Sequence, residues 1–284
     1  MRTRTDKPWR ERRDMTVCIA AVCTDGDDEK IILCSDTKWG GALGSREGGL
    51  KQLLLPHGWV CLTAGKEPDI ASLIRLFTEH FIDEGKLHAT KIDATIKQVL
   101  YRRKSELAEE YVQRHFGKSY DYFLKHGKAE FSSDHFFQTS QAITRIDLGA
   151  SFILAGFIEG MPEIYYTDEH CVARPAPHYA VIGEGEYVAS ASLLRRGLTT
   201  SAHFHYAMYF VYEAKRQAES VPSVGTETVM TVLSAKPEGG TKVNIMSEEY
   251  EKSLKEWFVK YGPQNMQPLK FEGNLWYERK KDKG

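Results

Sequence analysis

Residues 16–36 read TVCIAAVCTDGDDEKIILCSD, and this stretch decides the fold. It holds two apolar runs, Thr16–Cys23 and Ile31–Cys34, on either side of the turn-forming residues Asp25–Asp28. Short apolar, β-branched runs that flank a turn containing glycine and aspartate predict a β-hairpin. We therefore expect the core to begin with two antiparallel strands, the first of which opens at Thr16.

Similar patterns continue along the chain. A glycine-rich flexible loop at 40–49 leads to a second predicted hairpin, with strands at 51–55 and 59–63. Apolar residues at helical spacing then predict helices at about 68–81 and 92–116. The later patterns predict, in order, strands at 151–158, 163–167 and 179–182, helices from about 187 and at 202–218, strands at 226–234 and 242–246, and a helix at 248–261. This order predicts an α+β domain in which helices pack over stacked antiparallel sheets.

The chain divides into three parts by composition. Residues 1–15 are rich in arginine and lack an apolar pattern, so we interpret them as a disordered leader or as a start assigned too early. Residues 16–246 are expected to form the main domain. Within it, residues 117–147 are polar, aromatic and irregular, which indicates an insertion. Residues 247–284 are expected to form a C-terminal helix and a polar tail.

Composition excludes several classes of function. The 284 residues carry a formal net charge of -1, which argues against a general nucleic-acid binder. No apolar stretch reaches the ~18 residues of a membrane span, and no secretory signal is visible. The cysteines lack metal-binding spacing, and most lie in apolar runs, so we expect reduced, buried thiols and a cytoplasmic protein. They are Cys18, Cys23, Cys34, Cys61 and Cys171.

Thr16 is the residue with the most distinctive chemistry. If translation starts at Met15, removal of the methionine would give Thr16 both a free α-amine and a hydroxyl. A threonine hydroxyl needs an adjacent base to act as a nucleophile, and an α-amine titrates near ~8. One residue would then supply nucleophile and base. The alternative is that Thr16 is simply a β-branched residue at the start of a strand.

The stretch from Thr16 to Asp69 resembles the catalytic β-subunits of the proteasome and their bacterial homologues. Members of this family open with a threonine and a short hydrophobic strand, matched here by Thr16–Ala21. A second strand ends in a small residue and an aspartate, matched by Ser35–Asp36, and a glycine-rich loop leads to a lysine, matched by Lys51. The next strand ends in Ala64–Gly65. The resemblance implies an N-terminal-nucleophile (Ntn) hydrolase fold, a four-layer α/β/β/α sandwich with two stacked antiparallel sheets.

The resemblance also implies a role for particular residues. Thr16 would be the nucleophile, and its α-amine the base. Lys51 would lower the proton affinity of both groups through its positive charge, and Asp36 would hold Lys51 in place. The backbone N–H of Gly65 would face the developing oxyanion. Thr63 would line the pocket for the substrate side chain.

The sequence departs from the family pattern in its supporting residues. Glu184 stands where active members have a serine, and residues 220–225 contain serines but no aspartate. Met15 stands where a glycine usually precedes an autoprocessed threonine, which favours a start at Met15 over self-cleavage.

The resemblance therefore implies threonine-type hydrolysis of amide, chiefly peptide, bonds through an acyl-enzyme on Thr16. Two alternatives stay open: a small-molecule amidase of the same fold, and a non-catalytic, proteasome-like assembly subunit that keeps its N-terminal extension. The expected partners are a peptide or small amide and further copies of the chain in a ring or spiral. Nucleic acid, membrane, metal and cofactor are not expected.

Overall fold

The computed structural model describes residues 16–41, 44–46, 48–83, 89–167 and 172–263. The expected leader, Cys171 and the polar tail beyond residue 263 lie outside the described residues. The chain divides into a large compact unit that ends at Met246 and a small one that begins at Ser247. Within the described ranges, the strands form two five-stranded antiparallel sheets and a two-stranded ribbon.

The first sheet has the strand order β10-β1-β2-β11-β12. Its strands are β1 (Cys18–Asp25), β2 (Asp28–Asp36), β10 (Tyr179–Ile182), β11 (Thr228–Ala235) and β12 (Thr241–Ile245). The predicted first hairpin is confirmed, because β1 and β2 pair from Cys18 and Ser35 to Asp25 and Asp28. Its two-residue turn requires a positive φ, which Gly26 adopts at 67°.

The second sheet has the strand order β5-β6-β7-β8-β9. Its strands are β5 (Gln52–Leu54), β6 (Val60–Gly65), β7 (Ala150–Ile158), β8 (Met161–Thr167) and β9 (Ala173–Pro175). The predicted second hairpin is confirmed by the pairing of β5 with β6 around a 3-10 turn at Pro56–Gly58. Pairing of β6 with β7 then joins this hairpin to a segment almost a hundred residues later in the chain.

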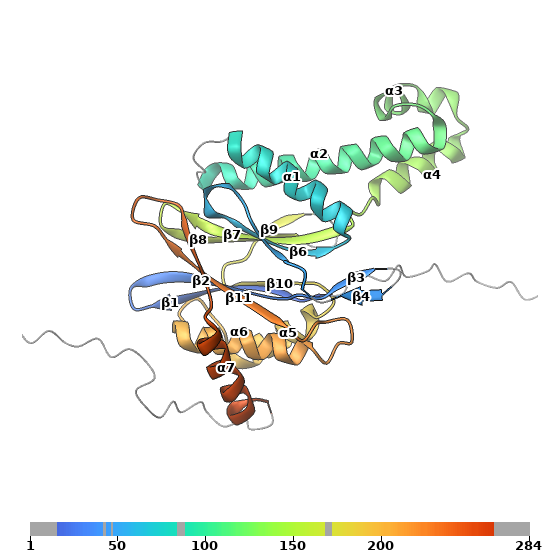
Figure 1. Ribbon diagram of the computed structural model, residues 1–284. Helices are drawn as coiled ribbons and strands as arrows, with labels where there is room; N and C mark the ends of the chain where they lie inside the picture. Colours follow the sequence, from blue (N-terminus) through green and yellow to red (C-terminus); the bar gives the residue numbers. More distant parts are fainter. Residues whose placement is uncertain (1–15, 42–43, 47, 84–88, 168–171, 264–284) are drawn as a thin grey trace, which may run out of the picture. The chain divides into compact units, whose positions relative to one another are not determined.

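Helices cover the outer face of each sheet. Helices α1 (Glu67–Asp83) and α2 (Ala89–Phe116) lie over the second sheet, and α5 (Glu186–Arg196) and α6 (Phe204–Ala218) lie over the first (Figure 1). The layers therefore follow the order helix, sheet, sheet, helix. The prediction of an α+β sandwich with two stacked antiparallel sheets is confirmed.

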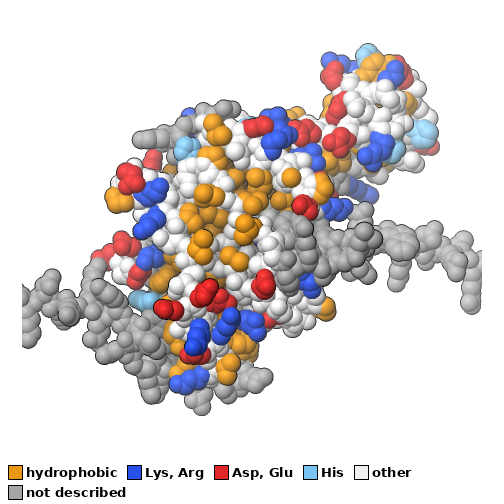
Figure 2. Space-filling model, viewed as in Figure 1, with side chains coloured by type: hydrophobic (Ala, Val, Ile, Leu, Met, Phe, Trp, Pro, Cys, Tyr) orange, Lys and Arg blue, Asp and Glu red, His pale blue; other side chains and the backbone are white. Residues whose placement is uncertain are grey.

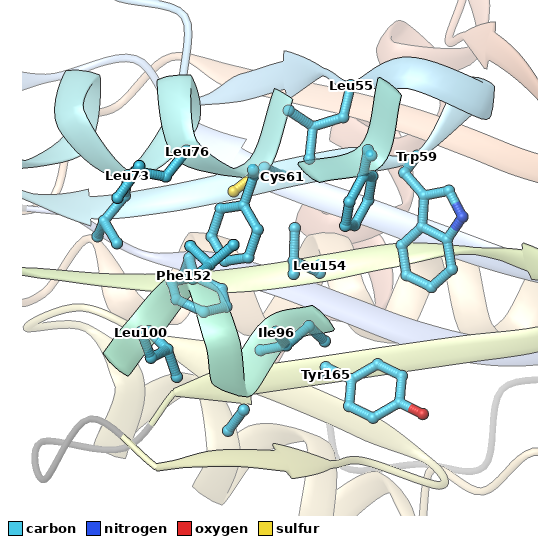
Figure 3. Close-up of a cluster of buried hydrophobic side chains, with 14 of the residues drawn as sticks. Leu55, Trp59, Cys61, Leu73, Leu76, Ile96, Leu100, Phe152, Leu154 and Tyr165 are labelled. Atoms are coloured by element: carbon cyan, nitrogen blue, oxygen red, sulfur yellow. The ribbon is translucent and has the colours of Figure 1, made fainter. Parts of the chain in front are cut away.

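Two apolar clusters among the described residues hold the α1–α2 layer and the two sheets together. Between the sheets, alternate side chains of β1 such as Cys18, Ala20 and Val22 meet Leu62 of β6. The other cluster lies between the second sheet and α1–α2, where Trp59 and Phe152 face Leu73 and Ile96 (Figure 3).

On the face drawn in Figure 2, further hydrophobic side chains gather over the sheet layers, and charged side chains lie above them on the α1–α2 layer. The burial of the apolar cluster between the sheets holds the two sheets face to face.

Residues 117–147 are not irregular, as the sequence suggested, but form helices α3 (Tyr120–Glu130) and α4 (Ser133–Thr144) at the far end of α2 (Figure 1). Ser119 and Ser132 cap these helices by accepting hydrogen bonds from backbone N–H groups of their first turns. Aromatic rings join the helices, with the centroids of Phe123 and Phe136 5.1 Å apart. Capping and aromatic packing therefore stabilise two helices that the polar composition did not predict.

Three further elements complete the described chain. Part of the glycine-rich loop, expected to be flexible, forms a ribbon of β3 (Trp39–Gly41) and β4 (Gly44–Arg46). The small unit contains α7 (Glu248–Tyr261), which Ser247 caps through its side chain. None of the helices in the described ranges combines the length and apolar character that a membrane span needs.

Candidate active site

Thr16 lies immediately before β1 and is almost fully buried, with 2% of its surface exposed. Its hydroxyl donates a hydrogen bond to Oδ1 of Asp36 and accepts one from Nζ of Lys51. Its carbonyl oxygen accepts a hydrogen bond from the backbone N–H of Gly185 at 3.1 Å. Both the side chain and the backbone of Thr16 are therefore fixed.

Asp36 is the last residue of β2 and is completely buried. Its Oδ1 also accepts a hydrogen bond from the backbone N–H of Val17 at 3.1 Å. Its Oδ2 accepts hydrogen bonds from the backbone N–H groups of Lys38 at 3.3 Å and Gly225 at 2.8 Å. These donors satisfy the oxygen atoms of a carboxylate that would otherwise be costly to bury.

Lys51 directly precedes β5, and only 4% of its surface is exposed. Its Nζ lies 2.9 Å from Oδ1 of Asp36. Because β2 and β5 belong to different sheets, this ion pair joins the two sheets at the point where Thr16 enters the core. The structure therefore brings together Thr16, Asp36 and Lys51, as the resemblance to proteasome β-subunits implies.

Cys18 lies beside this cluster, on the same face of the first strand as Thr16. Burial raises the pKa of the Cys18 thiol to about 12, and the positive charge of Lys51 offsets only part of that effect. Its Sγ donates a weak hydrogen bond to the carbonyl oxygen of Thr63 at 3.5 Å. Because the thiolate is the reactive form, Cys18 is a poor nucleophile near neutral pH. The hydroxyl of Thr16 is singled out by geometry instead, because it contacts both Lys51 and Asp36.

The other described cysteines are also buried and free, as expected. Burial raises the pKa of Cys23 to about 12, and it raises the pKa of Cys34 and Cys61 further.

Gly65 and Thr63 both belong to β6, the strand that leads into α1. Gly65 ends this strand with a φ of 136°, and a Cβ there would lie 2.5 Å from Cα of Ala150. Thr63 is buried, and its hydroxyl finds no hydrogen-bond partner among the described residues. The predicted oxyanion and pocket-lining roles of these residues stay predictions.

A cavity of about 1000 Å³ lies next to the cluster. Its wall includes Gly65, at the end of β6, and Gly183 and Glu184, between β10 and α5. A Cβ on Gly183 would lie 2.4 Å from the carbonyl oxygen of Thr16, so this part of the wall is in direct contact with the threonine. Thr63 is not among the described residues of the wall. Gly183 therefore connects the wall to Thr16, which is itself not among the described residues that line the cavity.

Sequence reasoning missed the backbone donors of the cluster, two of which come from distant parts of the chain. Gly185 fixes the carbonyl of Thr16, and Gly225 fixes the carboxylate of Asp36. Backbone N–H groups are present at nearly every residue, so a sequence gives little sign of which ones turn inward. The sequence marks these donors only by the short connections that contain them, Gly183–Gly185 and residues 220–225.

The ion pair predicts a specific pattern of stability. Replacing Asp36 by leucine or Lys51 by methionine should each lower the free energy of unfolding by about 3–5 kcal/mol, because a buried charge loses its partner. The double variant should be closer to the unmodified protein than either single variant. Urea unfolding at pH 7, followed by circular dichroism, measures all three. Strictly additive losses would contradict a coupled, buried pair.

The close approach of Gly183 predicts a second effect on stability. Gly183→Ala should cost about 1–3 kcal/mol for the positive φ of 97° and about 1–3 kcal/mol more for the collision with Thr16. Gly160→Ala is the matched control, because Gly160 has a φ of 85° and nothing within 4 Å of its Cβ position. Equal losses in urea unfolding would show that Gly183 is not packed against Thr16.

Comparison with solved structures identifies a similar fold. The chain is similar to the Anbu (Gly-1) mutant from Hyphomicrobium sp. strain MC1, with a TM-score of 0.56 and 16% sequence identity. The similarity covers 91% of this chain and 100% of that chain. No protein-family model and no curated protein sequence matches the chain. At this identity the likeness establishes the fold alone: the chain has the fold of a bacterial proteasome-like protein.

Proposed function

We propose that the protein is a threonine-type Ntn hydrolase that cleaves amide bonds, chiefly in peptides, through an acyl-enzyme on Thr16. The observation that carries the proposal is the Thr16 hydroxyl, which is held between Lys51 and Asp36 beside a large cavity. A proteasome-like fold is consistent with this chemistry but does not by itself imply it.

The proposed reaction has two steps. The Oγ1 atom of Thr16 attacks the carbonyl carbon of the substrate, while its proton passes to the α-amine of the same residue. The backbone N–H of Gly65 stabilises the oxyanion that forms, and the C–N bond breaks as the leaving amine takes the proton. Water then attacks the ester with the amine as base and restores the hydroxyl. Lys51 stabilises negative charge on Oγ1, and Asp36 keeps Lys51 in position.

This mechanism requires Thr16 to be the first residue of the active chain. While Met15 is attached, the nitrogen of Thr16 is an amide and cannot accept a proton. We propose that translation from Met15 and removal of this methionine supply the free amine, because threonine is a small residue. A chain that keeps residues 1–15 would instead be a non-catalytic subunit.

The mixed lining of the cavity, rather than its size alone, favours a peptide over a small amide. Its volume of about 1000 Å³ lies at the top of the ~300–1,000 Å³ range of small-molecule pockets. Its wall combines apolar groups, such as Leu107 and Ile182, with charged groups, such as Arg174 and Glu184, as varied side chains of a peptide would require. We further propose that the protein acts in the cytoplasm as a homo-oligomeric ring or spiral.

The direct test uses a chain that begins at Thr16, released from a cleavable fusion. This chain should hydrolyse members of a fluorogenic peptide panel. The chain that keeps Met15 should be at least about 100-fold slower, because it lacks the general base. Thr16→Ala should abolish both turnover and labelling by a threonine-reactive electrophile, whereas Lys51→Ala should lose most activity.

Controls make this test decisive. Circular dichroism of each variant separates loss of activity from loss of fold, and a parallel panel of small amides tests the amidase alternative. Full activity of Thr16→Ala, or equal activity with Met15 retained, would refute the proposal.

The α-amine also predicts a pH dependence. Only the unprotonated amine can accept the hydroxyl proton, and free α-amines titrate near ~8. The positive charge of Lys51 should displace this midpoint downward, because it disfavours a second cation nearby. We therefore expect kcat/KM of the Thr16 chain to rise with pH through a midpoint below that of a free peptide amine. A rate independent of pH between 5 and 9 would be inconsistent with the amine as base.

A further inference from the structure

Lys215, on α6, is a buried cation that the reaction proposed above does not use. Its exposed fraction is 0%. Its Nζ donates one hydrogen bond to Oε1 of Glu219 at 2.6 Å and another to the carbonyl oxygen of Thr226 at 3.0 Å. These two acceptors lie at either end of residues 219–226, which make up most of the connection between α6 and β11 and which we call the Gly225 segment. One side chain therefore holds both ends of this connection.

The Gly225 segment touches two of the three groups that fix Thr16, namely Asp36 and Gly185. The backbone N–H of Gly225 donates to Oδ2 of Asp36 at 2.8 Å. Val224 packs against the turn before α5, because a Cβ on Gly185 would lie 2.9 Å from its Cγ2 atom. Gly185 in turn donates its N–H to the carbonyl oxygen of Thr16 at 3.1 Å. The segment thus supports the carboxylate and the backbone contact of the threonine at once.

We propose that Lys215 is a positioning residue for the reaction at Thr16. It holds the carbonyl of Thr226, one residue after Gly225, and so keeps the N–H of Gly225 directed at Asp36. Asp36 then keeps its orientation toward Lys51 and Thr16. The inference rests on the proposed function for its kinetic part, because Lys215 acts through the segment and does not touch the reacting atoms.

A second buried ion pair on the same helix serves as the matched control. Glu213 is also 0% exposed, but it binds Arg196 of α5 at 2.6 Å and the hydroxyl of Tyr209 at 2.8 Å. Glu213 therefore links α6 to α5 through Arg196 and links two turns of α6 through Tyr209. None of these partners belongs to the Gly225 segment. A change at Glu213 disturbs the packing of α6 without releasing Gly225, so it separates positioning from general loss of stability.

The experiment compares Lys215→Met, Lys215→Arg and Glu213→Gln in the chain that begins at Thr16. Lys215→Met should lower kcat at least tenfold with KM changed less than twofold, because Asp36 and Thr16 lose their alignment but the cavity is intact. Lys215→Arg, which keeps a cationic donor, should restore at least a third of the lost kcat. Glu213→Gln should lose about as much thermal stability as Lys215→Met, but its kcat should change less than twofold.

Amide hydrogen exchange gives a readout that does not require turnover. Exchange at Gly225 should be at least tenfold faster in Lys215→Met than in the unmodified chain, and unchanged in Glu213→Gln. If the unmodified chain is inactive, the proposed function fails, but the exchange rates still test the positioning role. If Lys215→Met does not fold, Lys215→Gln, which keeps one donor, is compared with Glu213→Gln in the same way. Unchanged exchange at Gly225, or kcat losses in proportion to lost stability in both variants, would overturn the proposal.

Discussion

The contact between Asp36 and Lys51 is the constraint on which the rest of the site depends. Two charges buried to this degree are tolerated only if each finds partners, because the cost of leaving water is several kcal/mol per ion. The partners come from the end of β2, the start of β5, the first residues of the main domain and the connection after α6. All of these must meet at one point, so the ion pair fixes the relative position of the two sheets at this end of the sandwich.

Much of this arrangement could be predicted from sequence because it depends on local patterns. Apolar runs around Gly26 predict a hairpin whose strands run antiparallel, and that pairing alone brings the end of β2 back to the start of β1. Asp36 must then lie near Thr16. The lysine was harder to place from the chain itself, because Lys51 lies across the interface between sheets. Its position followed from the resemblance to proteasome β-subunits, and the structure puts its ammonium beside both partners.

The features that could not be predicted depend on contacts between residues far apart in the sequence, or on local sequence patterns that are weak. Gly225 donates a hydrogen bond to Asp36, which lies 189 residues earlier in the sequence. The donor is a backbone N–H, so the residue type gives no sign of this contact. Lys215 would be assigned to a solvated helical face by its charge, yet it is fully buried. Helices α3 and α4 were missed because their composition is polar, and their order comes from capping serines and a local aromatic cluster. Each failure involves a residue whose surroundings, rather than its type, determine what it does.

The geometry also constrains how the proposed enzyme and the non-catalytic alternative differ. The hydroxyl of Thr16 donates to Asp36 and accepts from Lys51. A carboxylate that also receives hydrogen bonds from Lys51, Val17 and Gly225 is poorly placed to remove that proton, because its lone pairs are already engaged. The ammonium of Lys51 can stabilise an alkoxide but cannot accept a proton. The proposed reaction therefore needs a further group as its base, and the nitrogen of Thr16 belongs to the same residue as the hydroxyl. Under the proposed mechanism, an amine at that position would allow catalysis, whereas an amide would leave only the non-catalytic alternative.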